Sequence, residues 1–373
     1  MENLPSDPRS RSFISVSSSS STNSNNNNNH NKNNKKDGGI DLSRALYWIS
    51  VVVVVVTLGP WRTILKYGVG FVVCMIAYLF VNQNNLLYVP KHPQFPRPNR
   101  LNPKGYKNPK EIGIEYENVN FKTKDGVTLN AWLMFASDSK NAPTLLYFHG
   151  NAGNIGLRMP NYKELVNRCK ANVFAVEYRG YGDSEGEPCE KGLTLDGVAA
   201  WKYLLSRNDV IDTSKIVIFG RSLGGAVAIH LASILRNERS DEEIQPRALL
   251  LENTFTSVQE MAVQLFPLLR ATWCIMDRLL ENKWQNIEKI ENVNCPILFL
   301  SGAKDNIVPP SHMKRLYELA SSSSSLDRVK MQIFPNSGHN DIPFTNQGQV
   351  QTVNLKYFQV ISEFLDHWCG GKN

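Results

Sequence analysis

One segment, residues 215–232, constrains the fold of this chain more than any other. After Lys215 it has a run of apolar, mostly β-branched residues typical of a buried strand, and it ends with residues that favour a helix. Between the two stands Gly220-Arg221-Ser222-Leu223-Gly224. A serine at a sharp strand-to-helix turn has its Oγ lifted clear of the backbone, and flanking glycines let strand and helix approach closely. The pattern predicts a nucleophile elbow, and an ordinary tight turn with an unreactive serine is the alternative.

A second segment, upstream of the first, supplies groups that such a serine needs around it. A buried-type strand at 143–148 runs into His149-Gly150-Asn151-Ala152-Gly153-Asn154. A glycine-rich loop in this place can direct a backbone N–H toward a reacting carbonyl oxygen, where two donors stabilise the developing negative charge. We expect the N–H groups of Leu223 and Asn151 to form this oxyanion hole, with Ala152 as the alternative to Asn151.

Two further apolar runs are each followed by a residue type that serine chemistry requires. Asp305 comes after the strand that starts near Cys295, and His339 lies in the loop after the strand that starts near Met331. A serine hydroxyl is a weak nucleophile, so a neutral imidazole must accept its proton and a carboxylate must hold that imidazole in the correct tautomer. Ser222, Asp305 and His339 are therefore the predicted catalytic triad.

Each of these roles has a competitor in the sequence. His149 is the rival base, although its position at the end of a strand suits a role in the oxyanion loop better. Asp341 and Glu252 are the rival acids, and Glu252 follows a strand that comes one too early in the order. The glycine-rich turn at 177–186 is interpreted as a structural loop, and bracing of the oxyanion loop by Arg179 is the alternative for this segment.

These motifs together resemble those of the membrane-anchored abhydrolase-domain serine hydrolases. The resemblance covers residues 110–370 and rests on His-Gly-Asn-Ala-Gly-Asn, Tyr-Arg-Gly-Tyr-Gly-x-Ser-x-Gly, Gly-Arg-Ser-Leu-Gly-Gly and Ser-Gly-x-x-Asp-x-x-Val-Pro. It implies an α/β-hydrolase fold with an eight-stranded sheet, and it implies Ser222, Asp305 and His339 as the triad. Relatives of this group include enzymes that remove fatty acyl chains from protein cysteines or from glycerolipids. The fold hosts many chemistries, so the resemblance alone implies no substrate.

The periodicity of residues 111–373 supports the same class. Short apolar runs at 127–135, 144–149 and 173–178 indicate strands, and residues 193–205 have the composition of a helix. Strands that alternate with helices predict an α/β fold, with a mostly parallel sheet covered on both faces. We interpret 111–373 as one domain, because domains of this class commonly use ~250 residues.

An insertion lies between Glu252 and Pro296, where the alternating pattern needs only a connection. It is rich in large apolar side chains, among them Met261, Phe266, Trp273 and Met276. A small cap over the active site would suit this place, since an apolar cap can line a pocket for an acyl chain. A helix that packs on the domain without touching a substrate is the alternative.

The composition divides the first 110 residues into three parts. Residues 1–44 contain serine and asparagine runs, bury too little apolar surface to fold, and are expected to be disordered. Residues 45–84 are apolar and are expected to anchor the chain in a membrane. One span is the simplest interpretation, and a shallow hairpin with a bend at Pro60 is the alternative. Residues 85–110 are a basic, proline-rich linker.

The side of the membrane that would hold the enzyme stays open in the sequence. Residues 85–110 carry six basic and no acidic side chains, nearly the whole net charge of +7. This run suits either a solvated linker or contact with anionic headgroups. Positive-inside counting favours a cytosolic enzyme. The family resemblance instead implies a type II signal anchor with the enzyme outside or in a lumen.

Other function classes find little support in the residues. There is no metal-ligand spacing, phosphate-binding loop or dinucleotide fingerprint, so neither a metal nor another cofactor is expected. The basic run lacks interleaved aromatic residues on a folded face, so nucleic acid is not an expected partner, and no obligate protein partner is evident.

The sequence thus leads to a hypothesis with two rivals. The hypothesis is a membrane-anchored serine hydrolase that cleaves an ester or thioester through an acyl-enzyme on Ser222, with a protein palmitoyl thioesterase as the first choice. A lysophospholipid or acylglycerol lipase is the alternative within the same chemistry. A non-catalytic membrane scaffold that keeps the hydrolase fold is the alternative from another class.

Overall fold

The computed structural model describes residues 42–92, 95–235, 245–323, 326–347 and 350–370. The chain divides into two compact units, Met1–Gly70 and Phe71–Asn373. The predicted disordered tail, 1–44, lies outside the described residues except for its last three, which belong to the first helix.

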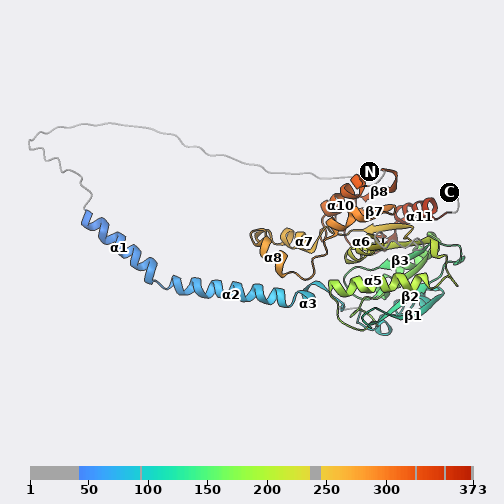
Figure 1. Cartoon of the computed structure of the whole chain (residues 1–373), viewed down its shortest axis with the longest axis horizontal. Coiled ribbons are helices and arrows are strands. Elements are labelled where there is room, and N and C mark those ends of the chain that lie inside the picture. Colours follow the sequence, from blue (N-terminus) through green and yellow to red (C-terminus); the bar gives the residue numbers. More distant parts are fainter. Residues whose placement is uncertain (1–41, 93–94, 236–244, 324–325, 348–349, 371–373) are drawn as a thin grey trace, which may run out of the picture. The chain divides into compact units, whose positions relative to one another are not determined.

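The second unit is built on one eight-stranded sheet with the order β1-β2-β4-β3-β5-β6-β7-β8 (Figure 1). The pairs β1/β2 and β2/β4 are antiparallel, and the pairs β3/β4, β3/β5, β5/β6, β6/β7 and β7/β8 are parallel. The predicted α/β-hydrolase fold with a mostly parallel eight-stranded sheet is confirmed. The strands are β1 (Tyr116–Lys122), β2 (Thr128–Met134), β3 (Thr144–Phe148), β4 (Asn172–Val176), β5 (Ile216–Arg221), β6 (Ala248–Glu252), β7 (Ile297–Gly302) and β8 (Val329–Phe334).

Both faces of the sheet are covered, which explains why its central strands are apolar throughout. Every residue of β3 to β7 is buried. Alternate residues of a strand face opposite sides, so Leu146 and Phe148 of β3 join one core and Leu145 and Tyr147 join the other. The first core includes residues of α5 (Glu190–Leu205), α6 (Leu223–Leu235) and α10 (Pro310–Ser323). The second includes residues of α4 (Met159–Arg168) and α11 (Leu355–Cys369).

Smaller elements connect these parts of the second unit. A two-stranded hairpin precedes α11, and the predicted insertion is present between β6 and β7 as short helices. The hairpin is β9 (Phe344–Gln347) with β10 (Val350–Val353). The insertion contains α7 (Val258–Leu265), η5 (Pro267–Thr272), α8 (Trp273–Leu279), α9 (Asn286–Lys289) and η6 (Ile290–Asn292). The remaining short helices are α3 (Gln83–Leu87), η1 (Asn99–Leu101), η2 (Pro109–Ile112), η3 (Ile155–Arg158), η4 (Thr213–Lys215) and η7 (Leu326–Arg328).

The insertion differs from the central strands of the sheet because some of its large apolar side chains are exposed. Phe266 is 64% exposed and Trp273 is 40% exposed, whereas Met276 is only 4% exposed. Ser257 caps α7 by accepting a hydrogen bond from the Glu260 N–H. The insertion therefore keeps only part of its apolar surface inside the protein.

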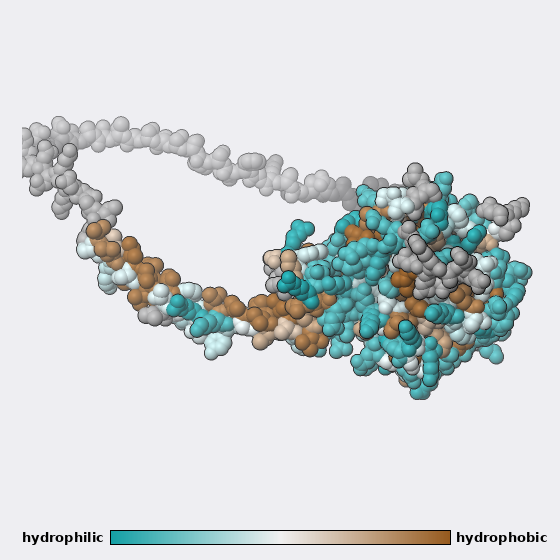
Figure 2. Space-filling model, viewed as in Figure 1, coloured by the Kyte–Doolittle hydropathy of each residue, from teal (hydrophilic) through white to brown (hydrophobic). Residues whose placement is uncertain are grey.

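Two apolar helices lie at the start of the described chain. They are α1 (Leu42–Leu58) and α2 (Trp61–Val81), and a break at Gly59 and Pro60 separates them. Their combined stretch, 42–81, is long and apolar enough to cross a membrane. Figure 2 shows hydrophobic surface along both helices, interrupted by a hydrophilic band near the start of α2. Arg62 and Lys66 are the basic residues of α2.

Candidate active site

Ser222 lies at the turn between β5 and α6, which is the strand-to-helix turn that the sequence predicts. Its φ is 52°, in the left-handed region that residues with a side chain rarely adopt. The Ser222 N–H donates to the Glu252 carbonyl at 2.9 Å, and the Thr254 hydroxyl donates to the Ser222 carbonyl at 2.8 Å. This strained turn is over-determined by its neighbours, which is the condition under which such a conformation persists.

The two glycines of the motif are required by close packing at this turn. A Cβ on Gly220 would lie 2.4 Å from the Gly224 carbonyl oxygen. A Cβ on Gly224 would lie 2.0 Å from the Phe148 carbonyl oxygen, at the end of the neighbouring strand β3. Both distances are far inside van der Waals contact, so no larger residue fits without moving the backbone.

The three residues predicted as a triad come together from three different strand ends. His339 Nε2 lies 3.0 Å from Ser222 Oγ, and His339 Nδ1 lies 2.7 Å from Asp305 Oδ2. The other carboxylate oxygen of Asp305 accepts from the N–H groups of Ile307 and Val308 at 2.9 and 2.8 Å. With Nδ1–H donating to the carboxylate, Nε2 is left as the acceptor that faces the hydroxyl. The arrangement can deprotonate a serine.

The rival acid Glu252 lies in a different polar cluster beneath the loop that carries His339. Its carboxylate pairs with Arg221 at 3.0 Å and accepts from the Tyr357 hydroxyl at 2.6 Å. Burial opposes the charge of Arg221, but attraction to Glu252 raises the pKa of the guanidinium above its usual value. Arg221 in turn donates to the His339 carbonyl at 2.8 Å and to Asn340 Oδ1 at 2.7 Å.

The other rival acid also has a structural position. Asp341 Oδ1 accepts from the Gly338 N–H at 2.6 Å, within the same loop as His339. Asn253 adds a bond from its side-chain amide to the His339 carbonyl at 3.2 Å. Among the described residues, neither rival carboxylate has a hydrogen bond to the imidazole of His339. Asp341 bonds the His339 loop directly, and Glu252 supports this loop through Arg221.

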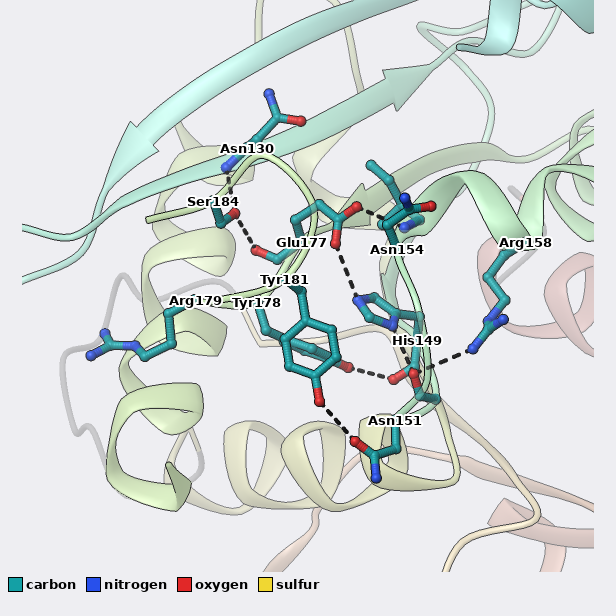
Figure 3. Close-up of polar contacts among 12 residues, drawn as sticks. Asn130, His149, Asn151, Asn154, Arg158, Glu177, Tyr178, Arg179, Tyr181 and Ser184 are labelled. Carbon is teal, nitrogen blue, oxygen red and sulfur yellow. Dashed lines mark hydrogen bonds and ion pairs between the residues drawn. The ribbon is translucent and has the colours of Figure 1, made fainter. Parts of the chain in front are cut away.

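His149 lies inside the oxyanion loop and not beside Ser222 Oγ. Its ring is fully buried, with Nδ1 2.8 Å from the Gly150 carbonyl oxygen and Nε2 3.6 Å from Glu177 (Figure 3). The Tyr178 hydroxyl donates to the His149 carbonyl at 2.7 Å. Glu177 also accepts from the Ile155 N–H at 2.7 Å, which ties the loop to the start of η3.

The same loop passes directly beside the nucleophile. A Cβ on Gly150 would lie 3.6 Å from the Ser222 Cβ. Arg158 donates to the Ala152 carbonyl at 2.8 Å and to the Gly150 carbonyl at 3.4 Å, and burial lowers the pKa of its guanidinium. In the described ranges, the backbone N–H groups of Asn151 and Leu223 take no part in turn, loop or cap hydrogen bonds. The role of these two N–H groups as oxyanion donors stays a prediction.

The loop after β4 requires one correction. Arg179, the alternative brace for the oxyanion loop, does not contact it and instead pairs with Asp125 at 2.8 Å and with Asp196 at 2.9 Å. These bonds tie the loop to the β1–β2 turn and to α5. Burial raises the pKa of Asp196 to about 6, although bonds from Arg179 oppose the shift. Besides Glu177 and Tyr178, Tyr181 of this loop reaches the oxyanion loop, because its hydroxyl donates to Asn151 Oδ1 at 2.7 Å (Figure 3).

A serine on this turn, between this sheet and this helix, defines an α/β hydrolase. Comparison with known proteins gives the family: the chain belongs to the α/β hydrolases that include Protein bem46 of Schizosaccharomyces pombe. The two are 39% identical over 308 residues, which cover 81% of this chain and 93% of bem46. Residues 190–372 match the model of the prolyl oligopeptidase family, Peptidase_S9.

Other similar proteins extend this picture. The α/β hydrolase domain-containing protein WAV2 of Arabidopsis thaliana is 36% identical over 79% of this chain and 94% of its own length. Lysophosphatidylserine lipase ABHD12 of Danio rerio is 31% identical over 61% of this chain and 65% of its own length. The esterase Pf2001 of Pyrococcus furiosus, at 19% identity, has a TM-score of 0.52 over 70% of this chain and 96% of its own. This last likeness shows the fold alone.

Proposed function

We propose that this protein is a membrane-anchored serine hydrolase that cleaves acyl esters or thioesters, with Ser222 as nucleophile. The observation that carries the proposal is the position of His339, within hydrogen-bond distance of both Ser222 Oγ and Asp305 Oδ2, at 3.0 and 2.7 Å. Geometry of this kind is what nucleophilic catalysis by serine requires. Membership of the α/β hydrolase family supports hydrolysis as the class of reaction.

In the first half of the reaction, Ser222 Oγ attacks the carbonyl carbon of the substrate while its proton passes to His339 Nε2. The carbonyl π electrons move to oxygen, and the N–H groups of Leu223 and Asn151 would bind this oxyanion. Asp305 stabilises the imidazolium without taking the proton itself. When the tetrahedral intermediate collapses, the alcohol or thiol leaves with the proton from His339, and an acyl-enzyme is left on Ser222.

The second half of the reaction repeats these steps with water. His339 accepts a proton from a water molecule as its oxygen attacks the acyl-enzyme, and the same two N–H groups hold the second oxyanion. Collapse returns the proton to Ser222 Oγ and releases a carboxylic acid. Every step uses groups of the chain and water.

Two observations bear on the substrate. The name of the relative ABHD12, lysophosphatidylserine lipase, favours a lysophospholipid ester over a protein thioester. The apolar stretch 42–81 would hold the enzyme where acyl chains are found, which suits either substrate. We therefore place lysophospholipid esters first and S-acyl cysteine thioesters second.

A fluorophosphonate probe tests the proposal directly, because it phosphonylates activated serines. The full chain in detergent should be labelled, and Ser222→Ala should not be, with turnover of ester substrates lower on the order of 10⁴-fold or more. Alanine has the same difficulty with positive φ as serine, so the variant should melt close to wild type.

Either of two results would remove this mechanism: a folded wild type that takes no label, which would favour the scaffold hypothesis, or persistent turnover by Ser222→Ala. Once labelling is established, lysophosphatidylserine, other lysophospholipids and a palmitoyl-cysteine peptide can be compared by kcat/KM. A higher kcat/KM for the thioester would reverse our ranking of substrates.

A further inference from the structure

Residues 83–89, the strap, begin one residue after α2 and lie against the oxyanion loop. The side-chain amide of Asn151 donates to the Leu87 carbonyl, and its oxygen accepts from the Val89 N–H at 3.0 Å. The Val89 carbonyl accepts from the Gly153 N–H at 3.1 Å. Three hydrogen bonds thus join two residues of the strap to two residues of the loop. The first residues of the segment 85–110, which the composition indicates as a linker, are therefore fixed to the domain.

A buried tyrosine completes this junction. The Tyr181 hydroxyl donates to Asn151 Oδ1 at 2.7 Å and accepts from the Val89 N–H at 3.1 Å. Its side chain is fully buried, and its ring centroid lies 5.6 Å from that of His149. Figure 3 shows Tyr181 and Asn151 on the side of the loop away from Arg158. The junction is therefore separate from the bonds that Arg158 makes.

The geometry of the peptide bond links these contacts to the predicted oxyanion donor. The Gly150 carbonyl and the Asn151 N–H belong to one planar trans peptide, so they point in opposite directions. His149 and Arg158 lie at 2.8 and 3.4 Å from the carbonyl oxygen and hold that end. The Asn151 side chain fixes the Cα that follows the N–H. Together these contacts determine the direction of the N–H.

The other end of the strap binds the insertion. The Gln83 side-chain oxygen accepts from the Glu281 N–H at 2.9 Å, and Asn282 donates to Asn84 Oδ1 at 2.6 Å. The Tyr88 hydroxyl donates to Asn282 Oδ1 at 2.9 Å. Figure 1 shows α3 beside the insertion helices. One short segment thus touches both the insertion and the oxyanion loop.

We propose that the strap is a positioning element of the active site. It acts through the side chain of Asn151, which keeps the backbone N–H of the same residue directed toward the oxyanion of the reaction. The inference rests on the proposed function. Only one residue separates Val81, the last of α2, from Gln83, so the strap links the end of this helix to the oxyanion loop by a short stretch of chain. The attachment of the anchor then affects the rate of the reaction as well as the location of the enzyme.

The substitution Asn151→Leu tests the proposal in the full chain in detergent. Leucine has a similar volume and keeps the backbone N–H but makes none of the side-chain bonds. Loss of a whole oxyanion donor costs about 10²–10³-fold in kcat, so a misdirected donor should lower kcat and the rate of fluorophosphonate labelling by about 10–100-fold. KM should stay within about 3-fold, because the change acts on the transition state. The pH dependence of labelling should keep its shape, since His339 and Asp305 are untouched.

Tyr181→Phe provides a second variant that keeps Asn151 itself. It removes one of the bonds to the Asn151 side chain and should slow labelling by about 3–10-fold. The double variant should be no slower than the product of the two single effects, and close to Asn151→Leu alone, because both changes break the same junction.

Asn130→Leu is the matched control. Asn130 is a buried asparagine of β2 whose side-chain amide donates to Asn118 and Asn120 of β1. Its link to Glu177, which holds the oxyanion loop, is made by the backbone and is kept in the variant. It should lose stability and keep the wild-type labelling rate. A folded Asn151→Leu that labels within about 2-fold of wild type would overturn the proposal. If Asn151→Leu does not fold, a wild-type rate in Tyr181→Phe would overturn it. Failure of wild type to label would instead count against the proposed function.

Discussion

Two helices of this chain are apolar on nearly every side, and their surroundings differ. In α6, 11 of the 13 residues are buried between the sheet and neighbouring helices. In α2, which has 21 residues, none is buried. A helix that is apolar all round needs apolar material on all sides, and the protein supplies it only for α6. The comparison teaches that an apolar composition indicates that a helix needs apolar surroundings, but it does not indicate whether protein or lipid provides them. For α2 we propose that lipid provides them.

A charge placed in each helix should give the largest difference. Val227 in α6 is fully buried and Val73 in α2 is 59% exposed. Val227→Asp would leave an unpaired charge in the core and should destabilise the second unit by about 3–5 kcal/mol, enough to prevent folding. Val73→Asp should leave its thermal unfolding in detergent unchanged, and it should weaken membrane insertion by about 2.5–3.5 kcal/mol.

Thermal melts of the full chain and the fraction resistant to carbonate extraction measure the two effects. Equal loss of thermal stability in both variants would show that α2 packs against protein, and the contrast between the helices would fail. Unchanged membrane retention of Val73→Asp would argue against lipid around this part of α2.

A smaller difference is expected from a single methyl group. A Cβ on Gly225 of α6 would lie 2.4 Å from the Thr254 side chain, whereas a Cβ on Gly70 of α2 would meet no atom within 4 Å. Gly225→Ala should therefore cost about 1–3 kcal/mol by overpacking, and Gly70→Ala should be neutral or slightly stabilising. Since Thr254 also bonds the Ser222 carbonyl, Gly225→Ala should slow fluorophosphonate labelling as well. Equal melting midpoints and labelling rates for the two variants would contradict the packing difference.

The sheet and the meeting of Ser222, Asp305 and His339 could be predicted because each depends on the sequence of strands, loops and helices along the chain. Strand, glycine motif and helix follow one another at Ser222, and parallel strands bring their carboxyl ends to one edge. Asp305 and His339 each follow such a strand, so their meeting with Ser222 needs only the strand order. The catalytic role of the three residues stays a prediction, and labelling tests it.

The supporting contacts could not be predicted because they join residues far apart in sequence. The Asn151 amide meets Leu87, 64 positions away, and Glu252 meets Tyr357, 105 positions away. Asparagine in a glycine-rich loop is common, and nothing in its neighbours indicates a bond to the segment after α2. The predicted start of the helix at 193 was also too late, because α5 begins at Glu190. Cys189 caps this helix, since its Sγ accepts a hydrogen bond from the Gly192 N–H.

The smallest effect concerns the one histidine of α6. Burial, with Lys289 nearby, lowers the pKa of His230 from 6.5 to about 4, and its Nδ1 has no hydrogen-bond partner among the described residues. As the pH falls from 6.5 toward 4, the unfolded chain takes up a proton that the folded chain refuses, so stability should fall, by about 1–2 kcal/mol for this partly buried ring. His230→Leu should remove this part of the decline, measured as the difference between melting curves at pH 7 and 4.5. An identical decline in both proteins would mean that the ring is solvated in the folded state, and α6 would then be less enclosed than its packing indicates.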